Sequence, residues 1–249
     1  MGSKPLLQVK DLCKRFGDFT ALDGVTLSVM EGATQAVIGP NGAGKTTLVN
    51  VITGLHPATG GNIILSGQEI SHASAFEIAR LGLIRTFQIT SLFLDLTVQE
   101  NIEIASVARK KYRLAKTGAD AKGTRDCREI VELVGLASVA NQKVENISHG
   151  DQRLLEVGVA LAADPHLLLL DEPTAGMSPS ETERFIELVN GQLKGEHTIV
   201  LIEHDMEVIM QTTDRITVLE SGRVLADGTP AEIMESPVVQ EAYLGRPQN

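Results

Sequence analysis

The sequence has few cysteines and no long apolar run, and both shortages narrow the classes of protein to consider. Only Cys13 and Cys127 occur among 249 residues, without a CxxC pair or a His-rich spacing. Neither a disulfide framework nor a zinc site is indicated, and a cytoplasmic location is favoured. The longest strongly apolar stretch, at 167–170, is far shorter than the roughly 20 residues that cross a bilayer. If a membrane is involved, we expect another chain to supply the span.

Basic residues are also in short supply. The chain has 22 Lys and Arg against 32 Asp and Glu, which gives a formal net charge of −10 at pH 7. Such a chain repels a phosphate backbone, and the sequence shows no basic stripe, so nucleic-acid binding is not expected. Any bound nucleotide needs a local positive site instead. The N-terminal segment lacks the apolar core of a signal peptide, and no secretion is expected.

Short β-rich runs alternate with longer helical stretches along the chain, which is the pattern of layered α/β proteins. The runs at 36–39, 167–171 and 198–204 are continuous and apolar, as expected for buried strands of a parallel sheet. Each precedes a polar or Gly-rich loop, where such folds place ligands. Shorter strands of hairpin type are predicted at 6–9, 21–29 and 63–65.

Helix starts can be predicted from capping residues. Two Ser/Thr-x-x-Glu capping boxes carry proline at the first helical position. They consist of Ser178, Pro179 and Glu181, and of Thr229, Pro230 and Glu232. The stretch at 97–136 is mostly helical in pattern, with an interruption at 116–124, so we expect an inserted helical layer there.

The strongest chemical signal is GPNGAGKTT at 39–47, a G-x-x-x-x-G-K-[ST] loop between a buried strand and a helical run. Its glycines let backbone N–H groups close around phosphates, and the helix N-terminus adds its dipole. Lys45 supplies a positive charge, and Thr46 offers a hydroxyl for Mg²⁺. A Gly-rich turn that binds nothing is the alternative. The residues expected to bind phosphate are Gly39, Pro40, Asn41, Gly42, Ala43, Gly44, Lys45, Thr46 and Thr47.

Polar residues follow three other expected strands. Asp171 and Glu172 end an apolar run, where one carboxylate can hold Mg²⁺ through water while the other orients or deprotonates an attacking water. Gln88 and His204 follow two further strand-like runs. Taken singly, a solvated Asp-Glu pair, a surface glutamine and a satisfied core histidine are the alternatives. Their joint placement favours a shared phosphate site.

A second anion site is suggested by the segment ISHGDQR at 147–153, which precedes a helical stretch. Read locally, Ser148 is only an N-cap. Read as an anion site, the Ser148 hydroxyl and the N–H groups near Gly150 form a second phosphate cradle. One chain then carries two cradles, and a single triphosphate can be shared between two chains that face each other head to tail.

Together these motifs resemble the ATP-binding subunits of ABC transporters, from about Leu6 to the end of the chain. The resemblance matches the P-loop to 39–47, the Q-loop glutamine to Gln88, the signature motif to 147–151, the Walker B pair to Asp171 and Glu172, and the switch histidine to His204. It implies an α/β fold, a P-loop NTPase with a RecA-like core, an antiparallel β subdomain and a helical subdomain. One domain over 1–249 is expected, with the helical subdomain inserted at about 89–163.

The same resemblance implies cofactors and residue roles. ATP and Mg²⁺ are the expected cofactors, and the expected metal ligands are Thr46, Gln88 and Asp171. The expected catalytic residues are Glu172, His204, Gln88 and Lys45. Besides the P-loop, the nucleotide is expected to contact Ser148 and Gly150 of a facing subunit. An aromatic residue that stacks on adenine is matched by Phe16, before Gly17, although Phe16 could equally be a core residue.

Implied partners are membrane permease subunits, a second ATPase subunit that is identical or paralogous, and indirectly a solute-binding protein. The expected location is the cytoplasmic face of the inner membrane. Two segments depart from the family pattern. The signature reads ISHGD instead of LSGGQ, with His149 for a glycine and Asp151 for glutamine, and the D-loop ends in Ser178 instead of aspartate. Asp151 adds a negative charge beside a polyphosphate site, and Ser178 puts communication between the two sites of a dimer in question.

Four short strings resemble importers for branched-chain amino acids and related amides: RTFQ at 85–88, DEPTAGMSP at 171–179, IEHDM at 202–206 and AYLG at 242–245. The expected function is therefore the ATP-hydrolysing subunit of such an importer. SHG at 148–150 with ETER at 181–184 is also similar to urea-type members, so a urea or short-chain amide importer is an alternative. A soluble ABC ATPase of DNA repair or translation, and a module that senses nucleotide without hydrolysing it, are the remaining alternatives.

Overall fold

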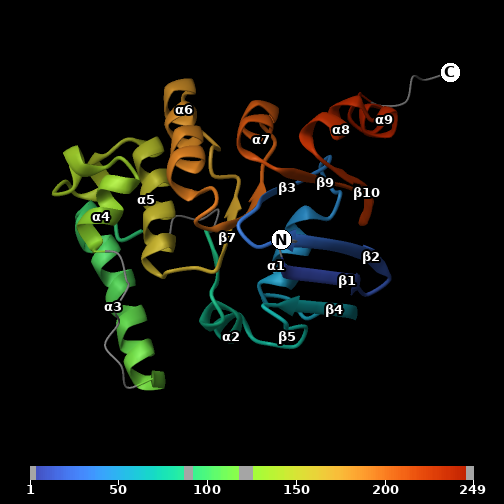
Figure 1. The fold of residues 1–249 in the computed structure, drawn as a ribbon, viewed down its shortest axis with the longest axis horizontal. Coiled ribbons are helices and arrows are strands. Elements are labelled where there is room, and N and C mark those ends of the chain that lie inside the picture. Colours follow the sequence, from blue (N-terminus) through green and yellow to red (C-terminus); the bar gives the residue numbers. More distant parts are fainter. Residues whose placement is uncertain (1–3, 87–91, 118–125, 245–249) are drawn as a thin grey trace.

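The computed structural model describes residues 4–86, 92–117 and 126–244. The strands in chain order are β1 (Pro5–Phe16), β2 (Phe19–Met30), β3 (Thr34–Ile38), β4 (Gly60–Leu65), β5 (Gln68–Glu69), β6 (Leu83–Arg85), β7 (Leu167–Asp171), β8 (Thr198–Ile202), β9 (Arg215–Glu220) and β10 (Arg223–Gly228). They form a six-stranded sheet in the order β10-β9-β3-β8-β7-β6 and a four-stranded sheet in the order β2-β1-β4-β5. Figure 1 shows the two sheets next to each other, with helices around them.

The six-stranded sheet is parallel except at one edge. Strands β6, β7, β8, β3 and β9 pair in parallel, and β10 pairs antiparallel with β9. Every residue of β3, β7 and β8 is buried, which confirms the strands predicted from the three continuous apolar runs. Because these strands are parallel, their carboxyl ends lie at one edge of the sheet.

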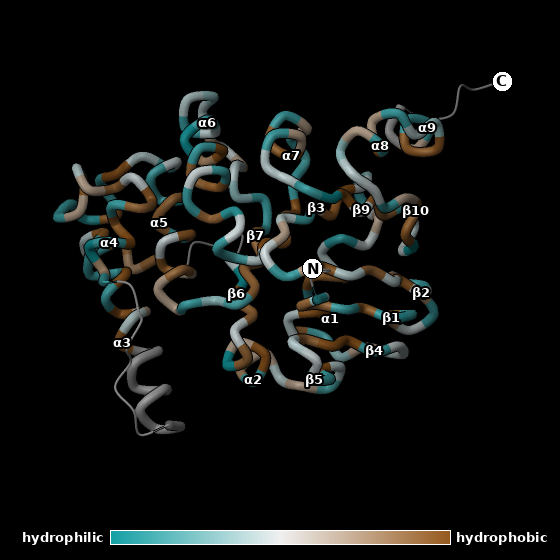
Figure 2. The backbone as a smooth tube through the Cα atoms, in the orientation of Figure 1, coloured by the Kyte–Doolittle hydropathy of each residue, from teal (hydrophilic) through white to brown (hydrophobic). Residues whose placement is uncertain are grey.

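Strand β7 shows why such a run has no polar alternation. Leu168 and Leu170 join one core cluster with the helical segments at 98–162 and 185–193, whereas Leu167 and Leu169 join a second cluster with the antiparallel strands. Both faces of β7 are therefore covered by apolar side chains. Figure 2 shows brown, hydrophobic segments of the chain at the centre of the molecule. A strand covered on both faces needs an apolar residue at every position.

The four-stranded sheet is antiparallel throughout. It confirms the strands predicted at 6–9, 21–29 and 63–65, and extends the first two into a long hairpin. Its inward side chains alternate along the strands, with Leu7, Val9, Leu27 and Val29 among the buried ones. This sheet packs on the same face of the parallel sheet as the helix that follows the P-loop.

The helices are α1 (Lys45–Ile52), α2 (Ala75–Arg80), α3 (Val98–Thr117), α4 (Cys127–Leu133), α5 (His149–Ala162), α6 (Pro179–Leu188), α7 (Met206–Thr212), α8 (Pro230–Glu235) and α9 (Pro237–Leu244). Helices α3, α4 and α5 gather at the opposite end of the molecule from the antiparallel sheet (Figure 1). They share one core cluster, in which Ile102 of α3, Val131 of α4 and Leu155 of α5 are buried. The fold thus has the parts expected of an α/β P-loop protein. The boundaries of a helical subdomain at about 89–163 stay a prediction.

Both predicted capping boxes are present, at the start of α6 and of α8. Helix α5 begins earlier than the apolar stretch suggested, because Ser148 accepts a hydrogen bond from the Asp151 amide and so caps a first turn made of polar residues. The predicted interruption at 116–124 lies mostly outside the described residues. Within the described ranges, no helix is long and apolar enough to cross a membrane. Cys13 and Cys127 are both free thiols.

Candidate nucleotide-binding and catalytic site

The loop at 39–44 joins β3 to α1 in a path that glycine makes possible. Gly39 and Gly44 have φ angles of 152° and 103°, in the region that side chains rarely adopt. A Cβ on Gly39 would lie 2.2 Å from the Leu219 carbonyl oxygen, and one on Gly44 would lie 2.9 Å from that of Ala21. The loop therefore needs glycine for both its turn and its close packing on neighbouring strands.

Lys45 opens α1 and places its ammonium against the same loop. Its Nζ lies 2.6 Å from the Gly39 carbonyl oxygen and 3.2 Å from that of Pro40. Burial lowers the pKa of the Lys45 ammonium below its ordinary value, and the nearby negative charge of Glu172 offsets part of that effect. No side chain caps the start of α1, so its first amide groups are not covered by a capping residue. The loop thus presents a fixed cation beside a helix N-terminus, which is the arrangement that binds phosphate.

A cleft brings three of the predicted elements together. Residues from the P-loop, from the end of β7 and from the end of β8 face one space, together with two residues of β2. The cleft is lined by Phe19, Ala21, Asn41, Gly42, Ala43, Gly44, Lys45, Thr46, Thr47, Glu172 and His204. The structure therefore brings Glu172 and His204 to the phosphate loop, as predicted from their positions after neighbouring strands.

Glu172 and His204 form a pair at the edge of this cleft. The Nε2 atom of His204 lies 2.9 Å from the Glu172 Oε1 atom. Strands β7 and β8 pair with Asp171 opposite Ile202, so the residues that follow them emerge side by side. Glu172 also has a φ angle of 51°, in the left-handed region that costs energy for a residue with a side chain, and its amide donates to the Ile202 carbonyl oxygen at 2.8 Å. Backbone strain of this kind clusters at functional sites.

A buried carboxylate that the sequence reasoning missed supports this pair. Glu203 is only 4% exposed and accepts hydrogen bonds from the Thr174 amide at 3.1 Å and from the Thr174 hydroxyl. Its other oxygen accepts the His204 amide at 2.7 Å. Glu203 therefore joins the loop after Glu172 to the backbone of His204. The sequence signal was a carboxylate directly after a fully apolar strand, which is unusual unless its hydrogen bonds are satisfied.

Asp171 lies behind the cleft, in a buried ion pair that was also missed. The Arg85 guanidinium on β6 places Nη2 2.6 Å from Asp171 Oδ2 and Nη1 2.7 Å from the side-chain oxygen of Asn50 on α1. The side chains of Arg85 and Asp171 are only 8% and 4% exposed, so solvent screens this ion pair little. Asp171 is not among the residues that line the cleft, and its role as a metal ligand stays a prediction. Gln88 lies outside the described residues.

The two aromatic residues of the first hairpin occupy different surroundings. Phe16 is half exposed, stands edge-on to the His56 ring with centroids 5.5 Å apart, and lies 4.7 Å below the Lys14 ammonium. Phe19 is 66% exposed and lines the cleft beside the P-loop, whereas Phe16 does not line it. Adenine stacking on Phe16 stays a prediction, and Phe19 is a candidate contact that the sequence reasoning did not single out.

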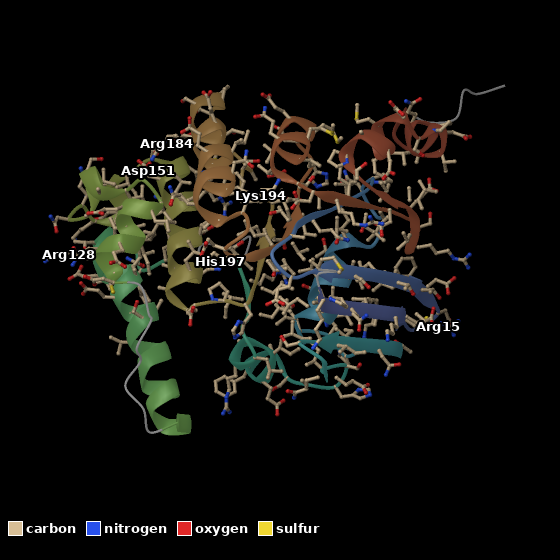
Figure 3. All side chains as sticks on the ribbon, in the orientation of Figure 1. Arg15, Arg128, Asp151, Arg184, Lys194 and His197 are labelled. Atoms are coloured by element: carbon tan, nitrogen blue, oxygen red, sulfur yellow. The ribbon has the colours of Figure 1, made fainter. Side chains whose placement is uncertain are left out.

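The signature segment forms the start of α5, apart from the cleft. The Ser148 hydroxyl both accepts the Asp151 amide at 3.0 Å and donates to Glu181 Oε1 at 2.9 Å. Neither Ser148 nor Gly150 lines the cleft that holds Lys45. The negative charge of Asp151 is paired within the chain, because its carboxylate lies 2.9 Å from the Arg184 guanidinium of α6, and Figure 3 shows the two residues next to each other. The two predicted phosphate cradles are thus separate sites.

Comparison with known proteins agrees with this geometry. Residues 22–175 match the family described as ABC transporter, and residues 223–248 match the one described as branched-chain amino acid ATP-binding cassette transporter. The chain is 42% identical to the high-affinity branched-chain amino acid transport ATP-binding protein BraF of Pseudomonas aeruginosa, over 98% of this chain and 99% of that protein. It is 41% identical to the protein LivG of the same description from Escherichia coli K12, with the same coverage.

Solved structures agree as well. The ADP conformation of an ATP-binding cassette of an ABC transporter matches with a TM-score of 0.84 and 30% identity, over 98% of this chain and all of that one. A nucleotide-free cassette matches with a TM-score of 0.83 and the same identity and coverage. These matches confirm the predicted fold class. The chain therefore belongs to the ABC transporter family, as one of its ATP-binding cassettes, the subunits that act as transport ATPases.

Proposed function

We propose that this chain powers an importer for branched-chain amino acids by hydrolysing ATP. The observation that carries the choice of solute is the match of residues 223–248 to the branched-chain amino acid cassette family, which lies outside the catalytic motifs shared by all cassettes. The names of the two relatives at 41% and 42% identity support the same branch. The partners would be membrane permease subunits, with a solute-binding protein acting through them, at the cytoplasmic face of the membrane.

The P-loop cleft supports binding of the ATP phosphates. Backbone amides of residues 41–47 and the Lys45 ammonium would surround the β- and γ-phosphates, because they line one cleft and present positive ends to it. Phe19 lines the same cleft on its open side and, with Phe16, is a candidate for contact with the adenine base. The cation fixed at the loop gives this acidic chain the local positive site that its composition requires.

The donor set also fits Mg²⁺. The Thr46 hydroxyl lines the cleft with Glu172, and hydroxyl, carboxylate and phosphate oxygens are the ligands that this ion accepts. Thr46, Gln88 and Asp171 would hold it, with the Asp171 carboxylate fixed in orientation by Arg85. When bound, the ion would neutralise charge on the phosphate oxygens.

Glu172 and His204 would act on the attacking water. The Glu172 carboxylate would accept a proton from water as its oxygen attacks the γ-phosphate in line with the leaving ADP oxygen. His204, 2.9 Å from that carboxylate, would hold Glu172 in position and face the charge that develops on the phosphate. Glu203 keeps both loops in register through its hydrogen bonds to Thr174 and His204.

Separation of the two cradles supports a two-subunit site. Ser148 and Gly150 lie at the N-terminal end of α5 and do not line the P-loop cleft of the same chain, so they would contact ATP held by a facing subunit. That subunit is either a second copy or a paralogue, and each of two ATP molecules would be enclosed between one P-loop and one signature segment.

The test is uptake of labelled leucine and of labelled urea into proteoliposomes that hold this chain with its co-purified membrane subunits and solute-binding protein. ATP-driven uptake of leucine and not urea is the expected result. Uptake of urea alone would replace the proposal with the urea-type importer, which the SHG and ETER strings resemble. ATP hydrolysis without any co-purifying membrane subunit would favour a soluble ATPase, and ATP binding without hydrolysis a sensing module.

A further inference from the structure

The Glu181 carboxylate lies on the signature segment itself. Its Oε1 atom accepts the hydroxyl of Ser148 at 2.9 Å, and its side chain lies against the backbone of Gly150. The contact is close, because a Cβ added to Gly150 would lie 2.2 Å from the Glu181 Cδ atom. A carboxylate on α6 is therefore bound to Ser148 and packed against Gly150, the two residues that the proposed function assigns to the γ-phosphate of a facing subunit.

Counting donors shows that the two roles exclude each other. A serine hydroxyl has one proton, and that of Ser148 is donated to Glu181 while its oxygen accepts the Asp151 amide at 3.0 Å. While Glu181 is in place, the Ser148 hydroxyl has no proton left to donate directly to a phosphate, and the Glu181 carboxylate lies in the space beside Gly150.

The carboxylate is anionic and held from both sides. Hydrogen bonds from the backbone and hydroxyl of Ser178, and then from Ser148, lower the pKa of the Glu181 carboxyl to about 2. Its second oxygen, Oε2, accepts the Ser178 amide and hydroxyl, each at 2.9 Å. The ion pair between Arg184 and Asp151 holds α6 against α5 one turn further along (Figure 3). One carboxylate thus joins the signature segment to the end of the loop that follows Glu172.

We propose that Glu181 occupies the cradle of Ser148 and Gly150 in the unpartnered subunit and is displaced by the terminal phosphate of ATP bound to the facing subunit. The inference rests on the proposed function, since it concerns the same two-subunit site. Glu181 is a positioning residue, which acts through Ser148 and Gly150. Association of the two subunits around ATP then requires exchange of one anion for another. The apparent affinity for ATP in this association equals the intrinsic affinity multiplied by the fraction of subunits whose cradle is open.

The exchange also gives the facing subunit a route to the catalytic loop. When Glu181 leaves Ser148, its other oxygen still contacts Ser178, which ends the loop that begins at Glu172. Arrival of ATP at one site would thus move a side chain that stays bound to the loop beside the other site. Here Ser178 stands where the family pattern has a D-loop aspartate, and Glu181 lies one helical turn further on.

The test measures ATP-dependent association by sedimentation velocity. The parent protein is the chain carrying Glu172→Gln, together with any second ATPase subunit that co-purifies. Glu181→Gln keeps an oxygen that can cap α6 and removes the charge. We expect it to lower the ATP concentration for half-maximal association about five- to tenfold, because a neutral amide oxygen accepts a weaker hydrogen bond from Ser148 than a carboxylate does. Glu183→Gln is the matched control on an exposed face of the same helix, and should leave that concentration unchanged.

Glu181→Ala, measured with its melting temperature, separates this role from helix capping. If the role of Glu181 is purely structural, the alanine variant has a lower melting temperature, and the glutamine variant associates at the same or a higher ATP concentration than its parent. That result would overturn the inference. If the parent and all variants bind ATP and remain monomeric, the two-subunit site of the proposed function is wrong, and the inference is overturned with it. Association of the parent without a shift in Glu181→Gln overturns the inference alone.

Discussion

At the scale of single residues, the proposed function assigns to Glu172 the chemistry that distinguishes hydrolysis from binding. Its carboxylate faces the P-loop cleft, pairs with His204 at 2.9 Å and sits on a strained backbone. We expect Glu172→Gln to lower ATP turnover at least about a hundredfold, because an amide cannot accept the proton of the attacking water. Steady-state phosphate release measures this, and ATP should remain bound in an associated complex. Unchanged turnover would contradict the assigned role, and Glu187→Gln, exposed on α6, is the control.

Glu181 also predicts a dependence of stability on pH. Its pKa is lowered from 4.5 to about 2 in the folded chain, first by the hydrogen bonds from Ser178. A carboxyl with a depressed folded pKa contributes stability above its unfolded pKa and loses it as the pH falls through the folded value. We therefore expect the difference in urea midpoint between the parent and Glu181→Gln to shrink on acidification from about pH 6 to about pH 3. A difference that grows over this range would contradict the assignment.

At the scale of secondary-structure elements, Arg85 joins β6, β7 and α1. Because its side chain and that of Asp171 are nearly buried, Arg85→Ala leaves a buried carboxylate without its partner, at an expected cost of about 3–5 kcal/mol in the free energy of unfolding. Urea denaturation measures this. The matched control is Arg223→Ala, which removes another Arg–Asp pair, with Asp23, whose side chains are 71% and 47% exposed. Exposed pairs contribute about 0–1 kcal/mol. Equal losses of unfolding free energy in the two variants would therefore argue against a stabilising role of the buried Arg85–Asp171 pair.

Elements were easier to predict from the sequence than the contacts between them. The strands at 167–171 and 198–202 follow from apolar runs, and the starts of α6 and α8 from local capping chemistry, because these signals lie within a few residues. The P-loop and the positions of Glu172 and His204 followed from motifs at strand ends. Arg85 and Glu181 were missed as site residues, since their partners lie 86 and 33 positions away and are set by packing alone. Phe19 was missed because the hairpin register decides which aromatic faces the cleft.

At the scale of the whole molecule, the P-loop cleft should couple ATP binding to stability. A ligand that binds only the folded chain at about a hundred times its dissociation constant adds ~2.7 kcal/mol to the free energy of unfolding. For a chain of 249 residues this corresponds to a rise of roughly 5–10 °C in melting temperature. We expect Lys45→Ala to abolish most of this rise, and Lys143→Ala, whose side chain is half exposed, to preserve it. Thermal denaturation with and without ATP measures this rise. An equal rise in melting temperature for Lys45→Ala and the unsubstituted chain would refute the phosphate contact.

The junction between α5 and α6 has a consequence for how such sequences diverge. Ser148 meets Glu181, Asp151 meets Arg184, and His149 lies against the backbone at Gly176, where an added Cβ would be 3.3 Å from its ring. Each residue that departs from the usual signature thus has its counterpart in the segment after Glu172. Replacing one side by the usual LSGGQ would leave the Arg184 charge unpaired and a gap beside Gly176. We therefore expect residues 147–151 and 176–184 to vary together among homologues. A chimaera should keep both segments from the same parent.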